Sequence, residues 1–127
     1  MNGVFYVALG GGLGAALRYG SAQVAARYVD QPGLWATLFV NGVGSFAMGL
    51  FLGWWASRGE PGGQPLYLFL AVGLLGGFTT YSAYAFETVK LIETGRLVEA
   101  GAYAVGTTLL CVLAFMLGAA CLARGAA

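Results

Sequence analysis

Long uncharged, apolar stretches alternate with short polar segments along this chain of 127 residues. Three stretches carry no charged residue and a fourth is interrupted only by Arg18: 31–57, 61–86, 100–123 and, with the arginine, 2–26. Each is longer than the roughly 20 residues that a helix needs to cross a bilayer. The pattern predicts a single domain over 1–127 with four transmembrane helices, at about 3–26, 34–56, 65–90 and 98–122.

Composition agrees with this prediction. Hydrophobic residues make up 59% of the chain and charged residues only 9%, whereas a soluble domain has about 25% charged residues. We therefore expect an all-α membrane protein surrounded by the lipid bilayer, with no nucleic acid partner. The two cysteines, Cys111 and Cys121, are about 15 Å apart along one predicted helix, too far for a disulfide. The chain has no histidine, so the sequence gives no support for a transition-metal site.

The connectors between the predicted helices are short, so neighbouring helices must be antiparallel. The basic residues then divide almost evenly between the two membrane faces: Arg58 and Arg124 on one, and Arg27, Lys90 and Arg96 on the other. The positive-inside rule has almost no bias to act on. A chain that inserts in both orientations can form an antiparallel homodimer, although an even division among six basic residues is equally consistent with chance.

Residues 76–87, with the sequence GGFTTYSAYAFE, are unusual inside an apolar run. Two glycines followed by two threonines loosen a helix at about the middle of the bilayer, where freed backbone groups persist only if they line a cavity or hold something. This segment therefore predicts a broken third helix and a candidate site.

Small residues recur every fourth position in three of the predicted helices, a spacing that allows close helix packing in lipid. These positions are Gly10 and Gly14; Ser45, Gly49 and Gly53; and Gly73 and Gly77.

Polar residues inside the predicted spans are candidates for function, and each has a simpler alternative. Arg18 is either an electropositive vestibule wall for an anion or a side chain that snorkels to the interface. Asn41 either lines or supports a pore, since its amide can donate to an anion, or makes a hydrogen bond between helices. Tyr103, Thr107 and Cys111 share one face of the last span, either as a polar track or with hydroxyls bonded to their own helix.

Tyr81 and Tyr84 are three residues apart and lie on one helix face. An aromatic ring has a positive edge that could coordinate a dehydrated anion weakly, although an aromatic pair at this spacing is more often core packing. Glu87 follows on the same face near the predicted helix end, with Lys90 three residues further on. A vestibule role for Glu87 and an interfacial ion pair with Lys90 both fit this spacing.

Three segments resemble, in order and spacing, the Fluc (CrcB) fluoride channel family. They are GGLGAALRY at 11–19, TLFVN at 37–41 and GGFTTYSAY at 76–84. The resemblance covers the whole chain. It implies a fluoride-selective passive channel in the bacterial inner membrane, which exports fluoride and is built as an antiparallel, dual-topology homodimer with two pores.

The resemblance also implies roles for individual residues. The backbone carbonyls of Gly76 and Thr79 would hold a structural sodium ion at the dimer interface. The implied anion path is lined by Asn41, Tyr81, Tyr84, Tyr103, Thr107 and Cys111, and the implied vestibule contains Arg18 and Glu87. The chain departs from the family pattern in three places: tyrosine stands at both pore phenylalanine positions, Ala83 lies between them, and the track ends in Cys111.

Two other functions stay open at this point. A small multidrug-resistance-type, proton-coupled exporter also has four spans and dual topology, but it needs a membrane-embedded carboxylate, and the first span has none. A non-transporting membrane accessory subunit would need no common face for its polar residues. We expect no enzyme, because the spans contain no nucleophile paired with a base and no acid pair.

Overall fold

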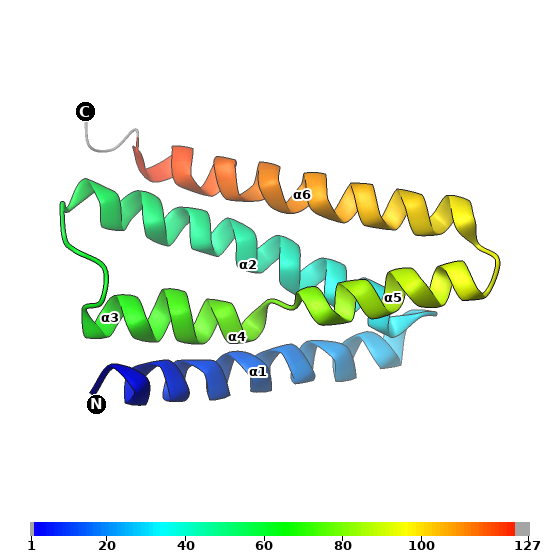
Figure 1. The fold of residues 1–127 in the computed structure, drawn as a ribbon, viewed down its shortest axis with the longest axis horizontal. Helices are drawn as coiled ribbons and strands as arrows, with labels where there is room; N and C mark the ends of the chain where they lie inside the picture. Colours follow the sequence, from blue (N-terminus) through cyan, green and yellow to red (C-terminus); the bar gives the residue numbers. More distant parts are fainter. Residues whose placement is uncertain (1, 124–127) are drawn as a thin grey trace.

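The computed structural model describes residues 2–123, which are helical apart from short connections (Figure 1). The helices are α1 (Asn2–Tyr28), α2 (Pro32–Ser57), α3 (Pro65–Tyr67), the π-helical segment η1 (Leu68–Leu75), α4 (Gly76–Phe78), α5 (Tyr81–Glu93) and α6 (Leu97–Ala123). No strand occurs in the described range, which confirms the all-α prediction for it. Arg124, which entered the charge comparison above, lies outside the described residues.

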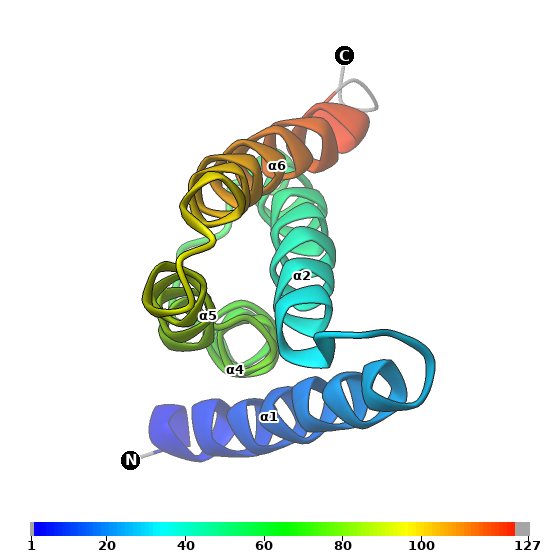
Figure 2. The ribbon, with the colours of Figure 1, turned by 90° about the vertical axis from the view of Figure 1, so that its right-hand side faces the viewer.

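The helices run along the long axis of the molecule, and α3, η1, α4 and α5 follow one another as one interrupted rod (Figure 1). Helix α6 packs mainly on α2, and α1 packs mainly on η1 and α4. Viewed end-on, α1 and α6 lie at opposite sides of the molecule, with α2 and the interrupted rod between them (Figure 2). This arrangement leaves the break between α4 and α5 close to α2, and α5 close to α6.

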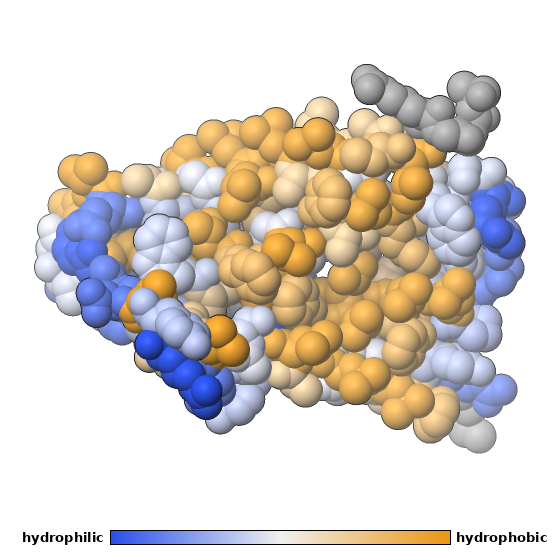
Figure 3. Space-filling model, turned by 180° about the vertical axis from the view of Figure 1, so that it is seen from behind, coloured by the Kyte–Doolittle hydropathy of each residue, from blue (hydrophilic) through white to orange (hydrophobic). Residues whose placement is uncertain are grey.

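Three helical stretches in the described range are long and apolar enough to cross a membrane: Pro32–Ser57, Pro65–Glu93 and Leu97–Leu122. They correspond to the second, third and fourth predicted spans. Helix α1 has a similar length of 27 residues but contains Arg18, Arg27 and several glycines, so it does not reach the same apolarity. Hydrophobic residues cover the middle of the molecule and hydrophilic residues gather at its two ends (Figure 3).

Glycines allow the closest helix contacts. A Cβ atom at Gly10 would come within 2.8 Å of the backbone nitrogen of Leu74, and one at Gly53 within 2.8 Å of the carbonyl oxygen of Ala119. Gly14 and Gly49 also face the backbone of a neighbouring helix. The predicted packing role of these glycines is confirmed, because no larger residue fits between the two backbones at this separation.

Helix α5 ends in a well-defined cap, at its turn into α6. Gly95 has a positive φ of 75°, its N–H donates to the carbonyl of Ile92, and the N–H of Arg96 donates to the carbonyl of Leu91, both at 2.9 Å. This pair of bonds is the Schellman motif, in which a glycine with positive φ ends the helix. The Arg96 side chain also donates to the Gln31 side chain, which ties this turn to the connector between α1 and α2.

Candidate functional site

The chain is extended at Thr79 and Thr80, between α4 and α5. Thr79 has φ −80° and ψ 159°, and Thr80 has φ −153° and ψ 118°. In a continuous α-helix the Thr80 N–H would donate to the carbonyl of Gly76, four residues earlier. Here that N–H donates to Asn41 Oδ1 at 2.7 Å, so the Gly76 carbonyl loses its helical donor.

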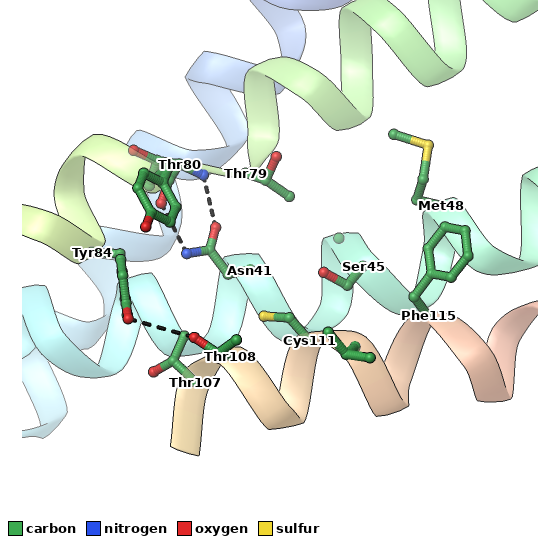
Figure 4. Close-up of a pocket in the computed structure, with 13 residues that line it drawn as sticks. Asn41, Ser45, Met48, Thr79, Thr80, Tyr84, Thr107, Thr108, Cys111 and Phe115 are labelled. Carbon is green, nitrogen blue, oxygen red and sulfur yellow. Dashed lines mark hydrogen bonds between the residues drawn. The ribbon is translucent and has the colours of Figure 1, made fainter. Parts of the chain in front are cut away.

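Asn41 holds this extended segment from α2. In addition to accepting from the Thr80 N–H, its Nδ2 donates to the Thr80 carbonyl at 2.9 Å. Both bonds are drawn in Figure 4, where the amide faces the backbone of Thr80. Asn41 is only 9% exposed, and an unpaired buried peptide group is costly, so the amide stabilises the break by replacing the helical bond that the Thr80 N–H gives up and by adding a donor to the Thr80 carbonyl.

Two more side chains, those of Arg18 and Thr80, form hydrogen bonds with the backbone at the break. Arg18 of α1 donates from Nη1 to the Thr79 carbonyl at 3.2 Å. The Thr80 hydroxyl caps α5 by accepting from the Ala83 N–H at 3.1 Å. Since each carbonyl oxygen has two lone pairs, Thr79 keeps one that Arg18 does not use. Arg18 therefore reaches the break, and its implied vestibule role stays a prediction.

A cavity of about 360 Å³ lies between α2, the break and α6. It is lined by Asn41, Gly44, Ser45, Met48, Thr79, Thr80, Tyr81, Tyr84, Thr107, Thr108, Cys111, Val112 and Phe115. The structure thus brings together five of the six implied path residues from three helices, while Tyr103 reaches the cavity only through its stacking on Tyr84. Gly76, Arg18 and Glu87 are not part of the lining.

The anion path predicted from the sequence does not include several of the lining residues, among them Ser45, Met48 and Phe115. A signal for them exists. Ser45 and Met48 follow Asn41 by four and seven residues on α2, and Phe115 follows Cys111 by four on α6, so all three continue faces already marked as polar. The helix spacing alone does not assign them to the path, because Met48 and Phe115 are apolar and Ser45 also fits the small-residue spacing of close helix packing.

Three tyrosines stack along one side of the cavity. The ring centroids of Tyr81 and Tyr84 are 5.1 Å apart, and those of Tyr84 and Tyr103 are 5.7 Å apart. The hydroxyls of Tyr103 and Thr107 are buried, on residues that are 8% and 4% exposed, and neither has a hydrogen-bond partner within residues 2–123. Buried polar groups without partners are rare, so these two hydroxyls can accommodate a water molecule or a small ion.

Glu87 packs against the first turn of α2. A Cβ atom at Gly33 would lie 3.0 Å from the carboxyl carbon of Glu87. The carboxylate therefore sits at the positive end of the α2 dipole, which stabilises a negative charge there. Among the described residues Glu87 forms no ion pair with Lys90, so the alternative of an interfacial pair is not what the structure shows.

The oxygen atoms at the break suit a hard cation. The Gly76 carbonyl has lost its helical donor and the Thr79 carbonyl keeps a free lone pair, and neutral carbonyl oxygens are ligands that hard cations prefer. Residues 2–123 contain no cluster of three or more His, Cys, Asp or Glu side chains that could hold a metal ion. The sodium site at Gly76 and Thr79 stays a prediction.

Together, the apolar helices and the cavity with polar side chains at a helix discontinuity define a class: small, multi-pass α-helical membrane proteins with a site near the predicted middle of the membrane. The chain belongs to the family described as CrcB-like protein, Camphor Resistance (CrcB), whose family model matches residues 5–119.

Similar curated proteins cover nearly the whole chain. A Fluoride-specific ion channel FluC of Hyphomonas neptunium is 48% identical over 118 residues, which is 93% of this chain and 93% of that protein. Proteins with the same name from Novosphingobium aromaticivorans and Thermus thermophilus are 41% and 42% identical, each over 93% of this chain and over 94% and 93% of the relative. The resemblance found in the three sequence segments is thereby confirmed.

Proposed function

We propose that this protein is a fluoride-selective passive ion channel in the bacterial inner membrane that exports fluoride and so lowers its cytoplasmic concentration. The observation that carries the proposal is the cavity at the helix break, into which three helices bring polar side chains, in a chain 48% identical to a protein named as a fluoride channel. The cavity contains donors such as the Thr107 hydroxyl but no basic side chain among the described residues that line it. Neutral donors hold an anion without trapping it, as conduction requires.

The proposed assembly is an antiparallel, dual-topology homodimer in which each subunit has four spans, with α1 as the first and a discontinuous third span. Two observations support it. The basic residues are nearly balanced between the membrane faces. Tyr81, at the predicted middle of the membrane and beside the polar break, is 81% exposed in the single chain, so a second copy would cover it.

We further propose that the carbonyls of Gly76 and Thr79 hold a structural sodium ion at the dimer interface. Such an ion would supply a fixed positive charge close to the anion path, which raises the local potential for anions. The free lone pairs described above support this assignment. The proposal needs both copies of the chain, because two carbonyls are too few ligands for a sodium ion.

Replacing sodium by a bulky organic cation is expected to lower both the thermal midpoint of the purified dimer and the fluoride efflux rate, because the carbonyls would then lack their ion. Thermal unfolding followed by size-exclusion chromatography measures the first, and a fluoride electrode measures the second. If both quantities stay constant without sodium, Gly76 and Thr79 do not form an ion site.

The two alternative functions receive less support. A proton-coupled multidrug exporter of the small type needs a carboxylate in its first helix, and α1 contains no acidic residue. An accessory subunit would not need polar side chains from three helices to meet at one cavity. A transport role without catalysis therefore fits the site best.

The decisive test of a passive channel is fluoride efflux from liposomes that contain the purified protein. We expect efflux down the fluoride gradient at a rate that does not depend on an imposed proton gradient. Liposomes without protein provide the control. A rate that requires a proton gradient would favour the exporter, and no fluoride efflux at all would favour the accessory subunit.

A further inference from the structure

The two tyrosines at the start of α5 use their hydroxyls differently. The Tyr84 hydroxyl donates to the carbonyl of Ala104 at 3.0 Å and lies 3.5 Å from the Thr108 hydroxyl. Figure 4 shows Tyr84 pointing across the cavity toward Thr108 on α6. Since this hydroxyl already has an acceptor on α6, it fixes the Tyr84 ring and is not available to a ligand.

The Tyr81 hydroxyl makes no hydrogen bond to any group in residues 2–123. Tyr81 lines the same cavity, and its ring is held 5.1 Å from the Tyr84 ring. Tyr81 is 81% exposed in the single chain, and at the predicted middle of the membrane a hydroxyl without a partner costs free energy, so it would meet water, an ion or a polar group of a second copy. Tyr81 is also the first residue of the 13-residue helix α5, where the helix dipole favours an anion.

We propose that Tyr81 binds the anion, with its phenolic O–H donating a hydrogen bond to fluoride, and that Tyr84 is a positioning residue whose hydroxyl locks the aromatic pair onto α6. This inference rests on the proposed channel function and deepens it. A phenolic O–H is a hydrogen-bond donor. Hydrogen bonds to an ionised acceptor are the strong ones, and fluoride, the smallest halide, accepts them best.

The assignment gives this chain a contact that phenylalanine cannot make. The family pattern places phenylalanine at both positions, and a phenyl ring offers only its weakly positive edge. The Tyr81 hydroxyl adds a directional donor that distinguishes fluoride from chloride, since the larger chloride is a poorer acceptor. Tyr81 is in this view a specificity-determining residue, whereas the hydroxyl of Tyr84 contributes to stability.

Three conservative variants test the inference in liposomes and in detergent: Tyr81→Phe, Tyr84→Phe and, as a control outside the cavity, Tyr19→Phe. We expect Tyr81→Phe to raise the half-saturating fluoride concentration of efflux about tenfold, the loss of one charge-assisted hydrogen bond. Its thermal midpoint should match that of the wild type. Tyr84→Phe should lower the thermal midpoint by about 2–4 °C, because it removes a bond between α5 and α6. Tyr19→Phe should change neither quantity.

Two results would overturn the inference. One is a half-saturating fluoride concentration for Tyr81→Phe within about twofold of the wild type, which is too small for a lost charge-assisted hydrogen bond. The other is a drop in the thermal midpoint of Tyr81→Phe as large as that of Tyr84→Phe, which would mean that the Tyr81 hydroxyl is bonded to the second subunit. Failure of the channel function itself is recognised separately, as an absence of fluoride efflux from the wild type, and it would overturn this inference too.

Discussion

Asn41→Ala is expected to abolish fluoride efflux and to destabilise the protein. The substitution removes the partner of the buried Thr80 N–H and one donor to the Thr80 carbonyl. An orphaned buried group costs about 1–3 kcal/mol, so we expect a loss of stability of about this size. Without the two hydrogen bonds between Asn41 and the Thr80 backbone, the extended segment loses the geometry that orients the neighbouring Gly76 and Thr79 carbonyls.

Thermal unfolding in detergent and fluoride efflux measure the two effects of Asn41→Ala. Ser45→Ala is the matched control for stability, because Ser45 lies one turn further along the same cavity face and makes no hydrogen bond within the described residues. Asn41→Asp keeps the acceptor for the Thr80 N–H but places a second acceptor against the Thr80 carbonyl and buries a negative charge, so it should also lose both stability and efflux. Equal thermal midpoints for Asn41→Ala and Ser45→Ala would show that the hydrogen bonds between Asn41 and Thr80 do not stabilise the protein.

Gly14→Val is expected to prevent correct packing of α1 against the interrupted rod. A Cβ atom at Gly14 would lie 2.7 Å from the Phe78 nitrogen and 3.0 Å from the Gly77 carbonyl carbon. The obstacle is backbone just before the break, which cannot rotate away as a side chain can. Overpacking costs about 1–3 kcal/mol or more, and here it also displaces the break.

Gly12→Val on the same helix provides the control, since nothing lies within 4 Å of a Cβ atom at Gly12. Both variants carry the same helix-propensity change, so only the contact differs. We expect a low yield of monodisperse protein for Gly14→Val on size-exclusion chromatography, and a near wild-type yield for Gly12→Val. Similar profiles for the two variants would show that the close approach of the helices is unimportant.

The uncharged stretches are sufficient to predict the helices, because a bilayer requires long apolar helices and allows few alternatives. The ends differ by a few residues: the sequence predicts that the third span ends at about 90, whereas α5 continues to Glu93. Charged residues mark the predicted ends, but a helix continues beyond the membrane until a cap such as Gly95 stops it. The sequence does not predict the π-helical segment Leu68–Leu75, since nothing in its apolar residues distinguishes it from an ordinary helix.

The candidate site is predictable in residue type and not in contacts. Polar residues in apolar helices point to Asn41 and Arg18, because such residues are costly in lipid. Their actual partners are Thr80 and Thr79, which lie 39 and 61 residues away in the chain. Such long-range bonds depend on how α1 and α2 pack against the break, which local sequence patterns do not encode. The same limit applies to the Tyr84 hydroxyl, whose acceptor is a backbone carbonyl of α6.

The most direct test of the central claim compares fluoride and chloride efflux from the same liposomes with ion-selective electrodes. A cavity that holds its anion by neutral donors and requires it to lose water should pass the small fluoride ion and exclude the larger chloride ion. We therefore predict rapid passive fluoride efflux and a chloride efflux no faster than that of protein-free liposomes. Comparable rates for the two anions, or no fluoride efflux, would contradict the assignment of this protein as a fluoride-selective channel.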